Sequence, residues 1–181
     1  MTRHRLAVVH PFDPRREPQD RIEDRLRAFL GSRPNDFEVL VVGVDRCGDV
    51  DPGETAEIEI GGRALSFLPV ARESGGGFTG GLLRHLPTVR AAARADIASI
   101  SVHAFAWAPF ARLVGRPIVL VVHEDPRADA VAGRAPFPAA LREHVALRIA
   151  DRVVAHDADF VRRCRETHPA LGAKTDLVPL A

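Results

Sequence analysis

The chain has 181 residues, of which 46% are hydrophobic and 27% are charged, and its formal net charge at pH 7 is +1. This length and composition are typical of one globular domain with a substantial core. A net charge so close to zero provides no basic field for nucleic acid, so no nucleic-acid partner is expected. No apolar run approaches the ~18 residues of a membrane span. The first residues show no signal peptide, so we expect a cytoplasmic protein.

Apolar runs alternate with helical patterns along the chain, which is typical of βαβ units and a mostly parallel sheet. Buried strands are expected at 6–9, 39–44, 96–103, 118–122, 153–155 and 175–180. The stretch 57–68 differs, because the two-residue turn Gly61-Gly62 favours a hairpin there. The sequence therefore predicts an α/β domain with a sheet of about seven strands.

Helices are expected between these strands. Asp20 and Glu23 have the spacing of a capping box, and the helix that they begin is expected to stop at Gly31. Further helices are expected around residues 82–93, 105–114, 137–150 and 157–164.

The segment Gly75–Gly80 matches the dinucleotide-binding pattern G-x-G-x-x-G and precedes a helix. That pattern belongs in the first βα turn, whereas here it follows a later strand region. We interpret 74–81 as a flexible loop over a cleft. An oxidoreductase that holds its cofactor on this loop stays open as an alternative.

Four of the eight histidines lie where a predicted strand ends, namely His10, His103, His123 and His156. The carboxyl ends of parallel strands share one edge of a sheet, and ligands bind in the crevice outside that edge. A single histidine at a strand end is more often a satisfied polar residue than a ligand. Four at equivalent places favour one shared polar cleft.

The cysteines and histidines do not have the spacing of a metal site. Cys47 and Cys164 fit no metal-binding motif. His123 with Glu124 and Asp125 supplies suitable ligand types, but without the helical spacing of known zinc motifs. No G-x-S-x-G motif is present, so a nucleophilic hydrolase has little support. We expect no metal ion and no cofactor.

Four segments carry a resemblance to family 4 (group 1) glycosyltransferases. They are RLAVVHPFDPR at the start, DIASISVHAFAWAPFARLVGRPIVLVVHEDP in the middle, LREHVALRIADRVVAHDADFVRR, and KTDLVPLA at the end. The resemblance implies the GT-B architecture, with a Rossmann-like three-layer α/β/α amino-terminal domain that binds the acceptor. A carboxy-terminal domain, absent here, binds the nucleotide-sugar. Residues 1–181 then form the single acceptor domain, which is expected to be inactive alone.

The same resemblance implies roles for individual residues. His123 matches the histidine that faces the transferred sugar and is the implied catalytic residue. His156 stands where the family usually has serine. Glu124 and Asp125 are also suited by residue type to accept hydrogen bonds from sugar hydroxyls. The residues implied on the acceptor and substrate side are His10, Phe12, Asp13, Arg15, Arg16, His103, Glu124, Asp125 and His156.

The implied function is transfer of a hexose from a nucleotide-sugar to a polysaccharide or glycolipid acceptor, with retention of configuration. The implied partners are the donor domain, the acceptor and, peripherally, the inner face of the membrane. The alternative is a stand-alone, non-catalytic sugar- or nucleotide-binding module, or a subunit that pairs with a separate donor domain.

Overall fold

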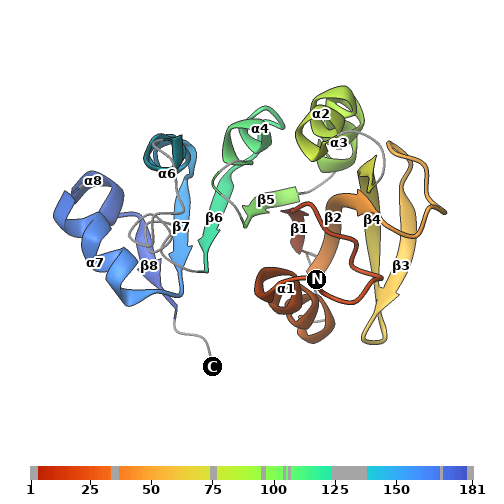
Figure 1. Cartoon of the computed structure of the whole chain (residues 1–181), viewed down its shortest axis with the longest axis horizontal. Coiled ribbons are helices and arrows are strands. Elements are labelled where there is room, and N and C mark those ends of the chain that lie inside the picture. The colour runs from red at the N-terminus through yellow and green to blue at the C-terminus, as the bar shows by residue number, and fades with distance from the viewer. Residues whose placement is uncertain are drawn as a thin grey trace.

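A computed structural model describes residues 4–33, 37–73, 77–94, 97–103, 105, 107–123, 138–167 and 169–178. In this part of the chain a single sheet of eight strands has the order β3-β4-β2-β1-β5-β6-β7-β8 (Figure 1). Only β3 and β4 pair antiparallel. The strands are β1 (His4–Val9), β2 (Phe37–Asp45), β3 (Ala56–Ile60), β4 (Arg63–Arg72), β5 (Ile97–Val102), β6 (Ile118–Val122), β7 (Arg152–Ala155) and β8 (Thr175–Leu177).

The predicted α/β class and mostly parallel sheet are confirmed, with eight strands where about seven were expected. The hairpin β3–β4 forms one end of the sheet. Gly61 and Gly62 both have positive φ, 58° and 75°, as a two-residue turn of this twist requires.

Helices lie on both faces of the sheet, giving three layers. In Figure 1, α2, α3, α4 and α6 lie above the sheet and α1 lies below it, while α7 and α8 pack at the β7–β8 end. Within the described residues, no helix has the length and apolar character needed to cross a membrane. The helices are α1 (Arg21–Ser32), α2 (Phe78–Arg84), α3 (Leu86–Arg94), α4 (Ala108–Arg112), α6 (Pro138–Ile149), α7 (Ala158–Thr167) and α8 (Pro169–Gly172).

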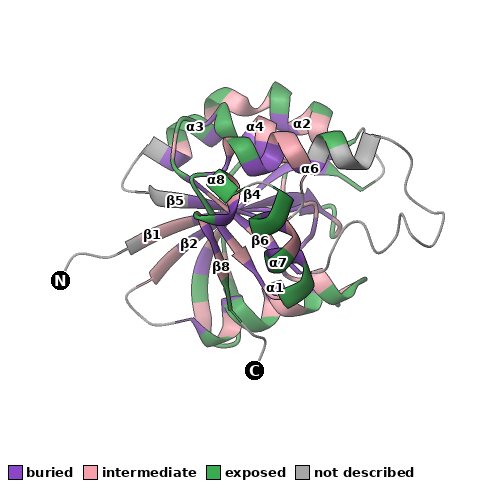
Figure 2. Ribbon diagram, turned by 90° about the vertical axis from the view of Figure 1, so that its left-hand side faces the viewer, coloured by how far each residue is buried: buried purple, intermediate pink, exposed green. Residues whose placement is uncertain are grey.

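The core is divided by the sheet into two clusters of buried side chains. Successive side chains of a strand point to opposite faces, so β1 supplies Ala7 and Val9 to one cluster and Val8 to the other. Val8 packs with Leu26 and Leu30 of α1, whereas the larger cluster extends under the helices of the opposite face. Figure 2 shows the buried residues concentrated along the strands. Burial on both faces explains why the strands are nearly continuous apolar runs.

Several helix boundaries differ from the expectation. Helix α4 begins at Ala108 and not at 105, and α7 continues past 164 to Thr167. Helix α1 continues through Gly31 to Ser32 and has Arg33 as its C-cap, so Gly31 does not end it. The helix expected at 82–93 is two helices, because the chain turns at His85 between α2 and α3.

The glycine-rich segment is partly helical. Gly77 is the N-cap of α2, and residues 78–81 form the first turn of that helix. A Cβ on Gly81 would lie 2.1 Å from the carbonyl oxygen of Val70, so this glycine allows α2 to pack against β4. The interpretation as a loop was wrong for residues 78–81, and residues 74–76 lie outside the described part of the chain.

The loop after β1 is held against β2 at Gly43. The carbonyl oxygen of Phe12 accepts a hydrogen bond from Val44 N at 3.0 Å, and His10 N donates to Val42 O at 3.2 Å. A Cβ on Gly43 would lie 2.2 Å from the same Phe12 oxygen. The absence of a side chain at Gly43 therefore allows the chain that carries His10 to lie against β2.

We expect Gly43→Ala to lower the free energy of unfolding by about 1–3 kcal/mol, the usual cost of overpacking a well-packed site. Urea denaturation measures this change. Gly80→Ala is the matched control, since a Cβ there meets nothing within 4 Å and alanine favours the helix. Equal stability of the Gly43→Ala protein and the wild type would contradict the close approach.

Candidate functional site

The sheet reverses its order at β1. The chain runs outward from β1 through β2 to β4, then returns to place β5 on the other side of β1. Ligands of open α/β sheets bind at such a switch point, outside the carboxyl ends of the strands. His10 follows the end of β1 and His103 follows the end of β5, so these two histidines flank the switch point.

The structure brings the four strand-end histidines together, as expected from the sequence. The ring centroids of His10 and His103 are 6.3 Å apart, those of His103 and His123 are 5.2 Å apart, and those of His123 and His156 are 5.2 Å apart. We refer to His10, His103, His123 and His156 as the histidine row. The row crosses the carboxyl ends of β1, β5, β6 and β7 in sheet order.

Hydrogen bonds order much of this row. His103 Nε2 lies 2.9 Å from Ser101 Oγ, and His103 Nδ1 lies 2.9 Å from His123 Nε2. His156 Nδ1 donates to the carbonyl oxygen of Val178 at 2.6 Å. Because a carbonyl only accepts, a neutral His156 carries its proton on Nδ1 and has an acceptor lone pair on Nε2.

Burial keeps three of the rings neutral. Loss of hydration lowers the pKa of His10 to about 4, although the carboxylates of Asp20 and Glu23 act in the opposite direction. It also lowers the pKa of His123 to about 4, and His156 and Arg25 add to this effect. The pKa of His103 lies well below its ordinary value, first through burial and then through the other three histidines.

These shifts predict that acid destabilises the fold. Between pH 6.5 and about 4 the unfolded chain protonates His10, His103 and His123, whereas the folded chain does not. Stability is therefore complete above pH 6.5 and falls as the pH drops, by up to about 1.4 kcal/mol per pH unit for each histidine. Denaturant titrations at several pH values measure the slope. The His10→Gln protein should lose about a third of it, and a slope unchanged by this substitution would contradict the shift.

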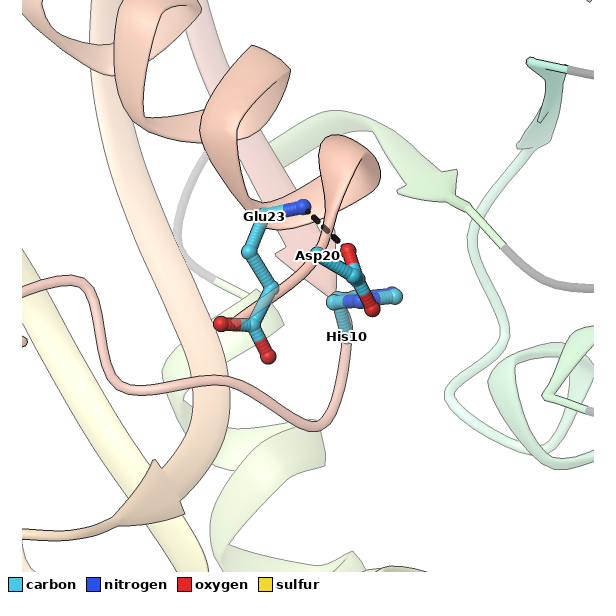
Figure 3. Close-up of side chains that lie close together, drawn as sticks. All are labelled: His10, Asp20 and Glu23. Carbon is cyan, nitrogen blue, oxygen red and sulfur yellow. Dashed lines mark hydrogen bonds between the residues drawn. The ribbon is translucent and has the colours of Figure 1, made fainter. Parts of the chain in front are cut away.

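His10 also has acidic neighbours. Ligand atoms of His10, Asp20 and Glu23 lie within 4.8 Å of one another, at the start of α1 (Figure 3). Asp20 Oδ1 caps the helix by accepting from Ile22 N and Glu23 N at 2.8 and 2.9 Å. Glu23 accepts from the Arg46 guanidinium at 2.8 and 2.9 Å, so its carboxylate is already paired. Among the described residues, these three form a group beside the row that could hold a cation, although Arg46 would compete with it.

The side chains of Asp13 and Arg15 belong to a network of ion pairs and not to the histidine row. Arg15 binds Asp13 Oδ2 at 2.8 Å and Asp45 Oδ1 at 2.6 Å, and both carboxylates are fully buried. Arg15 also forms an ion pair with Asp49, with 2.6 Å between Nη1 and Oδ1. Burial alone would raise the pKa of Asp13, but hydrogen bonds from Arg15 and Arg46 outweigh it and hold that pKa below its ordinary value. This network ties the loop after β1 to the end of β2.

The other expected site residues are placed differently. Phe12 is buried in the core and lies edge-on to His10, with ring centroids 5.7 Å apart. Arg16 is exposed, and its carbonyl oxygen accepts from Arg27 Nη1 at 3.1 Å. Glu124 and Asp125 lie outside the described residues.

Sequence reasoning missed three residues at the row. Ser101 bonds His103, Asp20 lies beside His10, and Arg25 of α1 is close enough to His123 to lower the pKa of that ring. One guanidinium nitrogen of Arg25, Nη1, is buried and has no hydrogen-bond partner in the described part of the chain. The spacing Ser101-x-His103 at the end of β5 was the available signal, since residues i and i+2 of extended chain lie on the same side. Nothing in the sequence distinguishes Arg25 from the other arginines.

An apolar cavity of about 530 Å³ opens among α2, α4 and α6, next to the segment that follows His103. Trp107 packs edge-on against Phe78 of α2, with ring centroids 5.0 Å apart. The cavity is lined by Thr79, Phe105, Trp107, Pro109, Phe110, Leu141 and Val145.

Solved structures share this fold. UGT2 of Phytolacca americana, complexed with UDP-2-fluoro-glucose and pterostilbene, matches with a TM-score of 0.55 and 12% sequence identity, over 99% of this chain and 54% of that one. A UGT transferase from Siraitia grosvenorii in complex with UDP matches with a TM-score of 0.55 and 10% sequence identity. The match covers 98% of this chain and 50% of that one. This chain spans about half the length of those structures. At these identities the likeness shows the fold, which is Rossmann-like. No protein-family model matches the chain, and neither does any curated protein.

Proposed function

We propose that this chain is the amino-terminal domain of a GT-B glycosyltransferase and forms the acceptor side of its active site. The observation that carries the proposal is the histidine row, which lies at the switch point of a fold shared with half of each UGT structure. The sequence motifs favour family 4 and a retaining reaction as the finer form of the proposal.

The row is suited to bind a polyhydroxylated ligand. Three of its rings are held neutral by burial, and the neutral form of His156 has a lone pair on Nε2 that a hydroxyl can donate to. Neutral imidazoles contribute hydrogen bonds without attracting bulk anions. In the proposed reaction His123 contacts the transferred sugar, and His10 and His156 contact hydroxyls of the sugar and the acceptor. Both nitrogens of His103 are used by Ser101 and His123, so His103 makes no such contact.

Arg25 is a basic group close enough to His123 to lower the pKa of that ring. Its unpaired Nη1 can donate to an oxygen of the nucleotide-sugar phosphates, where negative charge develops as the sugar leaves.

The nucleotide-sugar enters as a co-substrate, and we propose no metal or cofactor. The apolar cavity among α2, α4 and α6 is suited to an apolar part of the acceptor, as a glycolipid would supply. We retain cytoplasmic location and peripheral membrane association as predictions.

A site of this kind closes between two domains, so one domain supplies only one wall. We therefore expect residues 1–181 alone to show no transfer and no hydrolysis with nucleotide-sugars. We expect transfer when the same chain is joined to, or mixed with, a second Rossmann-like domain that binds the nucleotide.

The test compares residues 1–181 with the product of the complete reading frame, using a panel of UDP- and GDP-sugars and detecting the released nucleotide. Robust transfer by the isolated chain would overturn the half-enzyme proposal. A complete reading frame that adds no second α/β domain, together with sugar binding by the chain alone, would instead establish the stand-alone binding module.

A further inference from the structure

Ser101, His103 and His123 form a linear series of hydrogen bonds at the carboxyl ends of β5 and β6. Ser101 Oγ lies 2.9 Å from His103 Nε2, and His103 Nδ1 lies 2.9 Å from His123 Nε2. The series ends at His123 Nδ1, which is buried and has no hydrogen-bond partner among the described residues. Both nitrogens of His103 are therefore committed, and one nitrogen of His123 is not.

This geometry limits where the proton on each ring can lie. A neutral imidazole has one donor nitrogen and one acceptor nitrogen, and burial keeps both rings neutral. Only two arrangements satisfy both hydrogen bonds. In the first, Ser101 donates to His103, which donates to His123, so that His123 carries its proton on Nδ1. In the second, His123 donates to His103, which donates to Ser101, and His123 Nδ1 is a bare lone pair.

Two independent reasons favour the second arrangement. The first arrangement leaves a buried N–H of His123 without an acceptor, and orphaned buried donors are rarer in proteins than under-satisfied acceptors. The first also places both protons on Nδ1, whereas an alkyl-substituted imidazole prefers its proton on the nitrogen remote from the side chain. The second arrangement places both protons on Nε2.

We infer that Ser101 and His103 are positioning residues that hold His123 in the Nε2–H tautomer, with Nδ1 as an acceptor. The only ring proton of His123 is then committed to His103. A ligand group that reaches His123 Nδ1 must be a hydrogen-bond donor, such as a hydroxyl, and not a phosphate or carboxylate oxygen.

A separate hydrogen bond determines which nitrogen of His156 can act as an acceptor. Its Nδ1 donates to the carbonyl oxygen of Val178, which leaves Nε2 as the acceptor in the neutral ring. His123 and His156 have neighbouring rings with centroids 5.2 Å apart. Two adjacent rings thus offer acceptor nitrogens of fixed identity, and this is the chemistry that recognises hydroxyl groups. Its meaning for catalysis rests on the proposed function, but the tautomers themselves do not.

Nitrogen NMR of the 181-residue chain labelled with ¹⁵N-histidine tests the inference. In the wild type we expect a pyridine-like shift for His123 Nδ1 and a pyrrole-like shift for Nε2, near the limits for a single tautomer. In the His103→Phe protein the ring volume is kept but both nitrogens are lost, so the two His123 shifts should move to intermediate values of a tautomer mixture. Ser101→Ala, a milder change, should shift them in the same direction.

His103→Asn is the conservative control, because its amide oxygen lies near the position of Nδ1 and can accept from His123 Nε2–H. It should restore the single tautomer of His123. The tautomer of His156, fixed by a backbone carbonyl, should be the same in all four proteins. A protonated His123 Nδ1 in the wild type overturns the inference, as do His123 shifts that do not change in the His103→Phe and Ser101→Ala proteins.

The NMR measurement does not depend on enzymatic turnover, so it tests the inference separately from the proposed function. A fixed His123 tautomer in a protein whose transfer activity is insensitive to His123→Ala would leave the inference standing and remove the catalytic role. A tautomer mixture in the wild type would remove the positioning role, whatever the activity.

Discussion

Arg15→Ala is expected to lower the free energy of unfolding by about 3–5 kcal/mol, the usual result of removing one partner of a buried ion pair. The substitution leaves the fully buried carboxylates of Asp13 and Asp45 without their guanidinium. It also removes the cation that lies 5.0 Å from the ring centroid of Phe67. Chemical denaturation monitored by circular dichroism measures the change.

Arg162→Ala is the matched control. Arg162 pairs with Asp159 at 2.7 Å, but both side chains are exposed, at 69% and 75%. An exposed pair of this kind contributes only about 0–1 kcal/mol, so this protein should be nearly as stable as the wild type. Comparable losses in the two variants would show that the Arg15 network contributes no more than a surface pair. Replacing Asp13 and Asp45 by asparagine in the Arg15→Ala background should recover part of the loss, because the uncompensated charges are then gone.

His123→Ala in the complete enzyme is expected to depress turnover by about 30- to 1000-fold, which corresponds to roughly 2–4 kcal/mol at the transition state. The proposed contact between this imidazole and the transferring sugar strengthens as the sugar leaves, so kcat should fall more than donor affinity. Steady-state kinetics with a separate binding titration measure the two effects. His85→Ala is the control, since His85 is not part of the row and lies between α2 and α3 beside Gly53.

Near-wild-type turnover of the His123→Ala enzyme would reduce this histidine to a structural residue at the end of a strand. A loss of donor affinity equal to the loss of turnover would assign it to ground-state binding instead.

The class of the fold and the position of the histidine row could be predicted from the sequence. The apolar runs at 6–9, 39–44 and 118–122 are continuous because both faces of those strands are buried. They can therefore be recognised as strands from the local sequence, without knowledge of their tertiary contacts. A histidine directly after such a run lies at a strand end, and parallel strands place their ends on one edge. The meeting of four histidines therefore followed from local patterns and one rule of topology.

Local glycine patterns were less informative, because the effect of a glycine depends on what packs against it. Gly31 was expected to end a helix, but α1 continues through it to Ser32. Gly81 was expected in a loop, yet it lets α2 pack against the carbonyl oxygen of Val70 on β4. Val70 is not close to Gly81 in the sequence, and only the packed structure brings the two together.

The tertiary structure alone decided which polar side chains face the row and which serve the fold. Asp13 and Arg15 lie in the segment expected to line the site. However, Arg15 binds Asp45 of β2, 30 residues away in the sequence, and the three side chains form a buried network. Ser101, Asp20 and Arg25 lie at the row because β5 and α1 place them there. Sequence patterns determine periodicity and strand ends, whereas the partners of a charged side chain depend on distances between elements that no local pattern encodes.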